Sequence, residues 1–188
     1  MEKETHSSKR ILKIGVCLLV AVFAQTSLKN IHPWFGYIDW LLLVTVYIGL
    51  MREPVAALLT GTAAGMLYDF SSLVPVVGVG GMGNLLAGYV AYWVSSAFFV
   101  EGLLIRSATV IGASVIAVIT RLFFYKVILK YPLPSTAALE LIWGPVLTFL
   151  LSFVLFPTLD QVFSVGGRAR LRRAEARRGL RRRKWKVK

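Results

Sequence analysis

Cysteine, histidine and acidic residues are scarce in this chain of 188 residues. Cys17 is the only cysteine, so the chain can form neither an intrachain disulfide nor a cysteine-based metal cluster. The two histidines, His6 and His32, have no partner at the spacing of a metal site. We therefore expect neither a metal nor a cofactor.

Known catalytic motifs are also missing from the sequence. No serine lies in a Gly-x-Ser-x-Gly context, and there is no His-Glu-x-x-His motif and no phosphate-binding loop. An acid–base pair could be assembled only from Asp69 and Glu140, and nothing else supports that pairing. We predict that the chain is not an enzyme.

Negative charge is scarce, and positive charge is concentrated at one end. The chain has 9 Asp and Glu against 22 Lys and Arg, a formal net charge of +13. Residues 166–188 hold 12 of the basic residues and a single acid, Glu175. The basic character therefore belongs to a tail and is not a property of the whole fold.

Hydrophobic residues make up 56% of the chain and charged residues 16%, with a mean hydropathy of +0.67. A soluble domain of this size needs a more polar surface. At about 20 residues per crossing, the apolar stretches allow roughly six membrane-spanning helices. We expect these near residues 11–28, 38–51, 55–70, 78–99, 107–124 and 137–156, the last extending to 163.

These spans predict an all-α integral membrane protein, with a cytoplasmic N-terminus (1–10), a six-helix domain (11–163) and a basic cytoplasmic tail (164–188). The basic start also resembles a secretory signal, but the long first run and the later spans favour an uncleaved helix. Spans two and three could instead form a hairpin of short, partly re-entrant helices.

The distribution of basic residues predicts the orientation. Lys and Arg accumulate on the cytoplasmic side of membrane proteins. With six spans and a cytoplasmic N-terminus, 18 basic residues lie inside, and four lie outside: Lys29, Arg121, Lys126 and Lys130. An odd number of crossings would place one basic end outside, so both ends are expected in the cytoplasm.

Small residues recur every four positions in spans three and four. Residues at this spacing share one helix face, and small ones let another helix approach closely. Such faces serve packing within the chain or form an interface for a partner or a lipid. Asn84 is expected to hydrogen-bond another helix. The residues assigned to this face are Ala57, Gly61, Gly65, Asp69, Asn84 and Gly88.

Four charged residues are expected near the outer ends of the spans, in one polar layer: Asp39, Asp69, Arg121 and Glu140. Isolated charges at this depth are costly, so some pairing is expected. One interpretation is an ion pair of Arg121 with Asp69 or Glu140 that fixes the helix register. The other is a polar site that is open to the outer face and binds a partner or a ligand.

The basic tail would attract any polyanion, but it follows directly after a membrane span. Each basic residue near an anionic lipid surface gains about 1 kcal/mol. We therefore expect lipid anchoring or a cytoplasmic partner, and no nucleic acid. The arginines assigned to this role are Arg172, Arg173, Arg177, Arg178, Arg181, Arg182 and Arg183.

Three segments resemble the MreD family of bacterial rod shape-determining proteins. They are residues 38–43 (IDWLLL), the Gly-x-x-x-Gly-x-x-x-Asp pattern of Gly61, Gly65 and Asp69, and residues 84–89 (NLLAGY) after Gly78. The resemblance covers residues 35–95, and the long basic tail departs from it. The resemblance to the MreD family implies a fold similar to that of the substrate-binding subunits of energy-coupling-factor transporters.

The resemblance also implies a function. Such proteins are non-enzymatic subunits of the cell-elongation machinery in the bacterial inner membrane and support lateral peptidoglycan synthesis. They bind an MreC-like protein and work, directly or indirectly, beside a RodA-type glycosyltransferase, a class B penicillin-binding transpeptidase and MreB filaments. The alternative is a small-molecule or lipid-precursor binding subunit of a membrane transporter, suggested by the outer polar layer.

Overall fold

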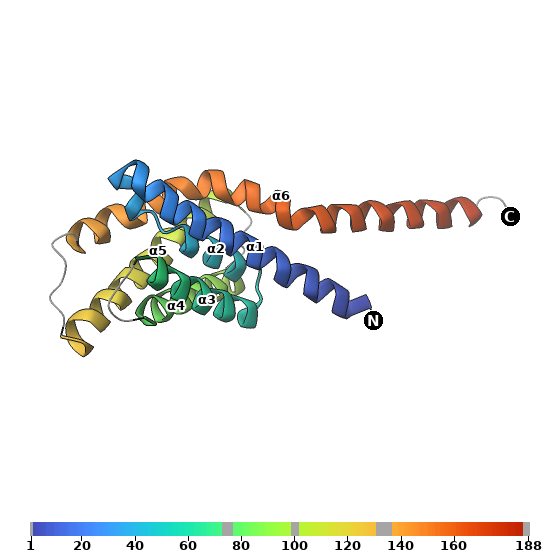
Figure 1. Cartoon of the computed structure of the whole chain (residues 1–188). Helices are drawn as coiled ribbons and strands as arrows, with labels where there is room; N and C mark the ends of the chain where they lie inside the picture. Colours follow the sequence, from blue (N-terminus) through green and yellow to red (C-terminus); the bar gives the residue numbers. More distant parts are fainter. Residues whose placement is uncertain (1, 73–76, 99–101, 131–136, 186–188) are drawn as a thin grey trace.

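The computed structural model describes residues 2–72, 77–98, 102–130 and 137–185, without the side chains of residues 2–10, 33, 72, 137, 138 and 164–185. These ranges contain six α-helices and no strand, which confirms the all-helical prediction (Figure 1). The helices are α1 (Glu2–Ile31), α2 (Trp40–Gly49), α3 (Pro54–Ser72), α4 (Val79–Ala97), α5 (Leu103–Phe123) and α6 (Ala137–Trp185). A 3₁₀ helix, η1 (Pro33–Tyr37), precedes α2, and a π-helix, η2 (Phe124–Ile128), follows α5.

Three helical segments are long and apolar enough to cross a membrane: Ile11–Ile31, Leu103–Ile128 and Leu139–Phe163. The apolar stretch Trp34–Gly49 is shorter. Within it, α2 has ten residues, so it is about 15 Å long, half of the hydrocarbon thickness of a bilayer. Six full crossings therefore stay a prediction, with three spans supported by length and composition.

Helix α2 occupies the centre of the bundle and contacts each of the other five helices. Its residues 41–49 are all buried. An α-helix that is apolar on every side is stable only when protein or lipid surrounds it completely. Because α2 carries apolar side chains all round, the other helices pack around it.

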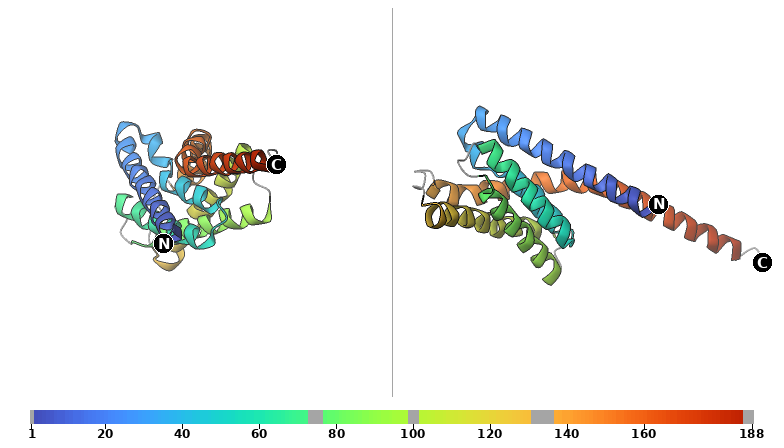
Figure 2. Two further views of the ribbon diagram at one scale, coloured as in Figure 1. Left: turned by 90° about the vertical axis from the view of Figure 1, so that its right-hand side faces the viewer. Right: turned by 60° about the horizontal axis from the view of Figure 1, so that its bottom comes forward.

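The surrounding helices run back and forth along the bundle. Helix α3 packs on α4, α4 on α5, and α5 on α6, while α1 packs on α2 and α3. The beginning of α1 and the end of α6 lie on the same side, and α6 continues far beyond the bundle there (Figures 1 and 2). We call this the inner side, and the opposite side the outer side.

The outside of the bundle is apolar. Phe23, Leu59 and Leu104 are each about 70% exposed, as are many other large hydrophobic side chains around the bundle. A soluble monomer rarely exposes such a continuous apolar surface. The surface is typical of helices that face lipid.

Candidate functional site

Helices α3 and α4 meet along a seam of small residues, where their backbones touch. A Cβ atom added to Gly61 would lie 2.6 Å from the carbonyl oxygen of Asn84, and one added to Gly88 would lie 2.9 Å from that of Ala57. A Cβ on Gly65 would collide with the backbone of Gly80. Each step of four residues along α3 matches a step of four back along α4, which fixes the antiparallel register.

Helix α4 also uses glycine against two other helices. A Cβ on Gly83 would lie 2.9 Å from the carbonyl oxygen of Ala117 in α5. In α2, a Cβ on Gly49 would lie 2.7 Å from the carbonyl oxygen of Gly88. Because these positions carry no side chain, α4 packs closely against α2, α3 and α5 at once.

Asp69 lies at the outer end of the seam and caps α4. Its carboxylate accepts hydrogen bonds from the backbone N–H of Gly78 at 2.7 Å and of Gly80 at 3.0 Å. Gly78 has φ +112°, a left-handed conformation that favours glycine. Asp69 was one of the two acids predicted to pair with Arg121. Within the described chain it makes no ion pair, and its carboxylate accepts hydrogen bonds from N–H groups at the start of α4 that have no partner inside the helix.

Asn84 differs from the sequence-based expectation. Its side chain is 1% exposed, and neither its amide nitrogen nor its amide oxygen has a hydrogen-bond partner in the described residues. The expected hydrogen bond to another helix is therefore wrong. Close backbone packing at the seam, and not this amide, joins α4 to α3.

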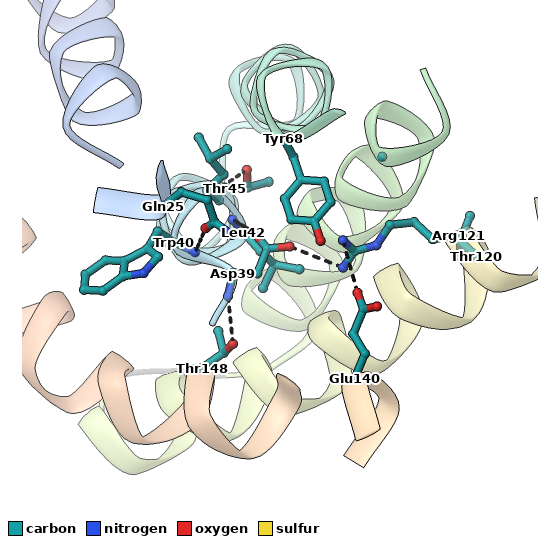
Figure 3. Close-up of polar contacts among 12 residues, drawn as sticks. Gln25, Asp39, Trp40, Leu42, Thr45, Tyr68, Thr120, Arg121, Glu140 and Thr148 are labelled. Carbon is teal, nitrogen blue, oxygen red and sulfur yellow. Dashed lines mark hydrogen bonds and ion pairs between the residues drawn. The ribbon is translucent and has the colours of Figure 1, made fainter. Parts of the chain in front are cut away.

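The outer polar layer centres on Arg121, which is 7% exposed (Figure 3). Its Nη2 atom donates to the Asp39 carboxylate at 3.3 Å, and its Nη1 atom lies 3.8 Å from the Glu140 carboxylate. The ring of Tyr68 lies 4.4 Å from the guanidinium group. Glu140 was one of the two acids that the sequence analysis predicted as partners of Arg121. Asp39, which lies closer to Arg121, was not predicted as its partner.

Asp39 also begins helix α2. Its carboxylate accepts the backbone N–H of Leu42 at 2.8 Å, and its own N–H donates to the Thr148 hydroxyl of α6 at 3.3 Å. The next N–H, of Trp40, donates to the Gln25 side chain of α1 at 3.0 Å. The outer layer therefore joins α1, α2, α3, α5 and α6 at one level (Figure 3).

A second charged cluster lies toward the inner side and was missed by the sequence analysis. Arg106 of α5 makes two hydrogen bonds to the Asp160 carboxylate of α6, at 2.9 and 3.1 Å. The Tyr47 hydroxyl of α2 donates to the same carboxylate at 2.8 Å. The sequence did contain a signal for this cluster. Asp160 follows an apolar run, and an acid at that depth in a membrane needs a charged or polar partner at the same depth.

The sequence matches the family model described as rod shape-determining protein MreD over residues 8–163. The chain belongs to the MreD family. No curated protein and no solved structure matches it. Membership in the MreD family implies a role in determining rod shape in bacteria, without enzymatic activity. The matched region runs from α1 to the apolar part of α6, so both charged clusters and the seam lie inside it.

The basic tail lies beyond the MreD match. Helix α6 continues through it to Trp185, and its arginine side chains lie outside the described residues. The tail's expected role therefore stays a prediction. Where the structure does describe the chain, no group of three or more His, Cys, Asp or Glu residues is placed to hold a metal ion.

Proposed function

We propose that this MreD-family chain is a membrane scaffold of the cell-elongation machinery, which binds an MreC-like protein and supports lateral peptidoglycan synthesis. Family membership over residues 8–163 is the observation that carries the proposal. The packing adds support, because the seam and both clusters join helices to one another. A rigid bundle with an apolar outer surface is suited to hold other membrane proteins through helix contacts.

The partners would be those of the family. A RodA-type glycosyltransferase and a class B penicillin-binding transpeptidase would work beside the scaffold, directly or through the MreC-like protein, and MreB filaments would lie on the cytoplasmic side. The partner-binding surface would be lipid-facing, because the small-residue faces of α3 and α4 already pack against each other. The seam residues would then act by keeping that surface in shape.

We place the chain in the bacterial inner membrane with six crossings and both ends in the cytoplasm. The back-and-forth path of the six helices supports this, as does the common side of the start of α1 and the end of α6. The residues Lys13, Arg52 and Arg106 lie toward that side in the chain's path, which agrees with positive charge on the inside. In this orientation the tail arginines would face anionic lipid or a cytoplasmic partner.

The proposal is tested by depletion and by affinity purification from membranes. Depletion should make rod-shaped cells round, and re-expression of the chain should restore rods. The tagged chain, solubilised in a mild detergent, should recover an MreC-like single-span protein. Cells that stay rod-shaped, together with purification of no such protein, would refute the scaffold function.

A further inference from the structure

Arg121 has more hydrogen-bond donors than its neighbours accept. A guanidinium group carries five N–H donors and no acceptor. The Nη2 atom donates to Asp39, and the Tyr68 side chain also interacts with the guanidinium group, but Nε and Nη1 are buried and make no hydrogen bond in the described chain. Buried donors without acceptors are unfavourable, more so on a charged group. The site therefore favours a further group that only accepts hydrogen bonds.

The Glu140 carboxylate lies near Nη1 of Arg121 but makes no hydrogen bond to it. At 3.8 Å its carboxylate is beyond hydrogen-bond distance from Nη1, and its side chain is 31% exposed. It lies in the first turn of α6, at the outer end of the bundle. Since Asp39 already neutralises Arg121, the charge of Glu140 is surplus, and its side chain can turn outward without leaving Arg121 unpaired.

Two further buried polar groups, on Tyr125 and Asn84, have no hydrogen-bond partner in the described residues. The Tyr125 hydroxyl, one turn after Arg121, is buried without a hydrogen bond in the described part of the chain and interacts electrostatically with Asp69, Arg121 and Glu140. The Asn84 amide follows Gly83, whose missing Cβ would lie 3.4 Å from Cγ of Arg121. Side chains on a helix lean toward its N-terminus, so Asn84 leans toward the outer layer. The Tyr125 hydroxyl therefore adds a donor one helical turn from Arg121, and Asn84 adds one next to the glycine where α4 contacts Arg121.

We propose that Arg121 binds one oxyanion of an amphiphilic ligand, which exchanges with the Glu140 carboxylate. The ligand's negative charge takes the place of the carboxylate at the guanidinium group, and the displaced Glu140 carboxylate keeps its own charge closer to solvent. Arg121 prefers a planar or tetrahedral oxyanion such as phosphate, because several of its donors can bind the same group. This site goes beyond the scaffold function and gives the ligand-binding alternative a defined chemical class.

The surroundings favour a phosphate that is carried by a lipid over a free phosphate ion. Leu139, Leu141 and Ile142 flank Glu140 on α6, and all three are apolar and exposed. An acyl or prenyl chain could lie along this face while its headgroup reaches Arg121. A cation is not favoured, because Asp39 is bound to Arg121 and Asp69 to the start of α4.

The test is a titration of the purified full chain in dodecyl maltoside, a neutral detergent, with dodecyl phosphate. Native mass spectrometry counts the bound molecules. One dodecyl phosphate per chain should bind tightly, and inorganic phosphate should bind more weakly. Equal affinities for the two would overturn the assignment to a lipid, and no specific dodecyl phosphate binding would overturn the site itself.

Variants separate the site from non-specific binding. Arg121→Lys keeps the charge opposite Asp39 but loses the fork of donors, and should weaken dodecyl phosphate binding about tenfold. Glu140→Gln removes the competing carboxylate and should tighten binding. The control is Arg106→Lys in the inner cluster, a guanidinium paired with a carboxylate at similar distance, and it should leave binding unchanged.

Folding must be compared in the same samples. The double variant Asp39→Asn with Arg121→Gln removes both buried charges together, so it tests the site even if Arg121→Lys melts early. Binding that survives in both Arg121 variants, or that weakens in Glu140→Gln, would refute the exchange. The assay contains no partner protein, so its result does not depend on whether the scaffold proposal holds.

Discussion

Glycine residues decide how closely α4 approaches its neighbours. In lipid there is little hydrophobic driving force between helices, so association depends on van der Waals contact and on polar groups. At Gly61, Gly65 and Gly88 a side chain would occupy space that the backbone of the facing helix already fills. Gly112 on α5 is different, because a Cβ there would meet nothing within 4 Å.

This contrast gives a matched pair of substitutions. Gly65→Leu should separate α3 from α4 and lower the melting temperature of the detergent-solubilised chain, because overpacking costs about 1–3 kcal/mol or more. Gly112→Leu should change the melting temperature little. Rod-shape rescue should fail for the first variant and succeed for the second. Similar melting temperatures for both variants would contradict the role of the seam.

Asp39 has two functions that can be separated by substitution. Asp39→Ala removes the cap of α2 and leaves Arg121 without its closer partner, and breaking a buried ion pair in this way costs about 3–5 kcal/mol. Asp39→Asn keeps an oxygen for the Leu42 N–H and should cost less. Adding Arg121→Gln to Asp39→Ala should restore part of the loss. Thermal unfolding measures all three, and additive losses in the double variant would argue against the pair.

The partners of single residues could be predicted only in part. The spacing of four showed which small residues share a face, and the rarity of charge at membrane depth indicated that Arg121 needs a partner. The sequence could not choose between acids, because Asp39, Asp69 and Glu140 were all expected in one layer. The backbone geometry determines which acids pair with Arg121. Asp69 accepts hydrogen bonds from N–H groups at the start of α4, so Arg121 pairs with Asp39 and Glu140.

At the scale of elements, α2 is held at both ends by the same two helices. Its outer end pairs with Arg121 of α5 and Thr148 of α6, and its inner end contacts Arg106 and Asp160 through Tyr47. A helix of ten residues has little stability of its own. Its position is therefore set by the polar groups at its two ends and by apolar contacts between them.

The inner end can be weakened with a small change. Tyr47→Phe removes the hydrogen bond to Asp160, which contributes about 1.5–3 kcal/mol when the acceptor is charged. We expect faster amide hydrogen exchange in α2 and in the part of α6 near Asp160. Tyr89→Phe, at a tyrosine that is 46% exposed on α4, serves as the control. Equal exchange in the two variants would show that the inner cluster does not hold α2.

The start of α4 depends on a residue of α3. Asp69→Ala removes the acceptor for two N–H groups, and loss of such a cap costs about 0.5–2 kcal/mol. Hydrogen exchange of the amides of Gly78 and Gly80 should become faster, while the amides near Ala91, in the later turns of α4, should keep their rates. Unchanged exchange at both glycines would mean that other groups satisfy the helix start.

The number and type of the elements could be predicted better than their lengths. Six apolar stretches correspond to six helices in the described residues, because apolar runs between polar turns are strong signals. Helix α2 (Trp40–Gly49) is shorter than the expected span 38–51, because Asp39 caps its start and a turn begins at Leu50. Helix α6 is longer than its apolar part and passes through Gly166 and Gly167, where the sequence suggested the start of a separate tail.

At the scale of the whole molecule, the proposed function depends on how the bundle lies in the membrane. The apolar outer surface, the MreD match and the common side of the two chain ends fit one arrangement. In the proposed arrangement, with both chain ends in the cytoplasm, the seam and the inner cluster would hold the helices together and Glu140 would open to the periplasm. The proposed scaffold function requires this orientation, because MreB filaments would lie on the cytoplasmic side.

Site-directed labelling with a membrane-impermeant maleimide tests this orientation most directly. In a Cys17→Ser background, single cysteines would replace Glu4 before the first span, Asn30 at the outer end of α1, and Trp185 near the end of α6. Intact spheroplasts should label only the cysteine at position 30, and permeabilised cells should label all three. Labelling of position 4 or 185 in intact spheroplasts would contradict the account.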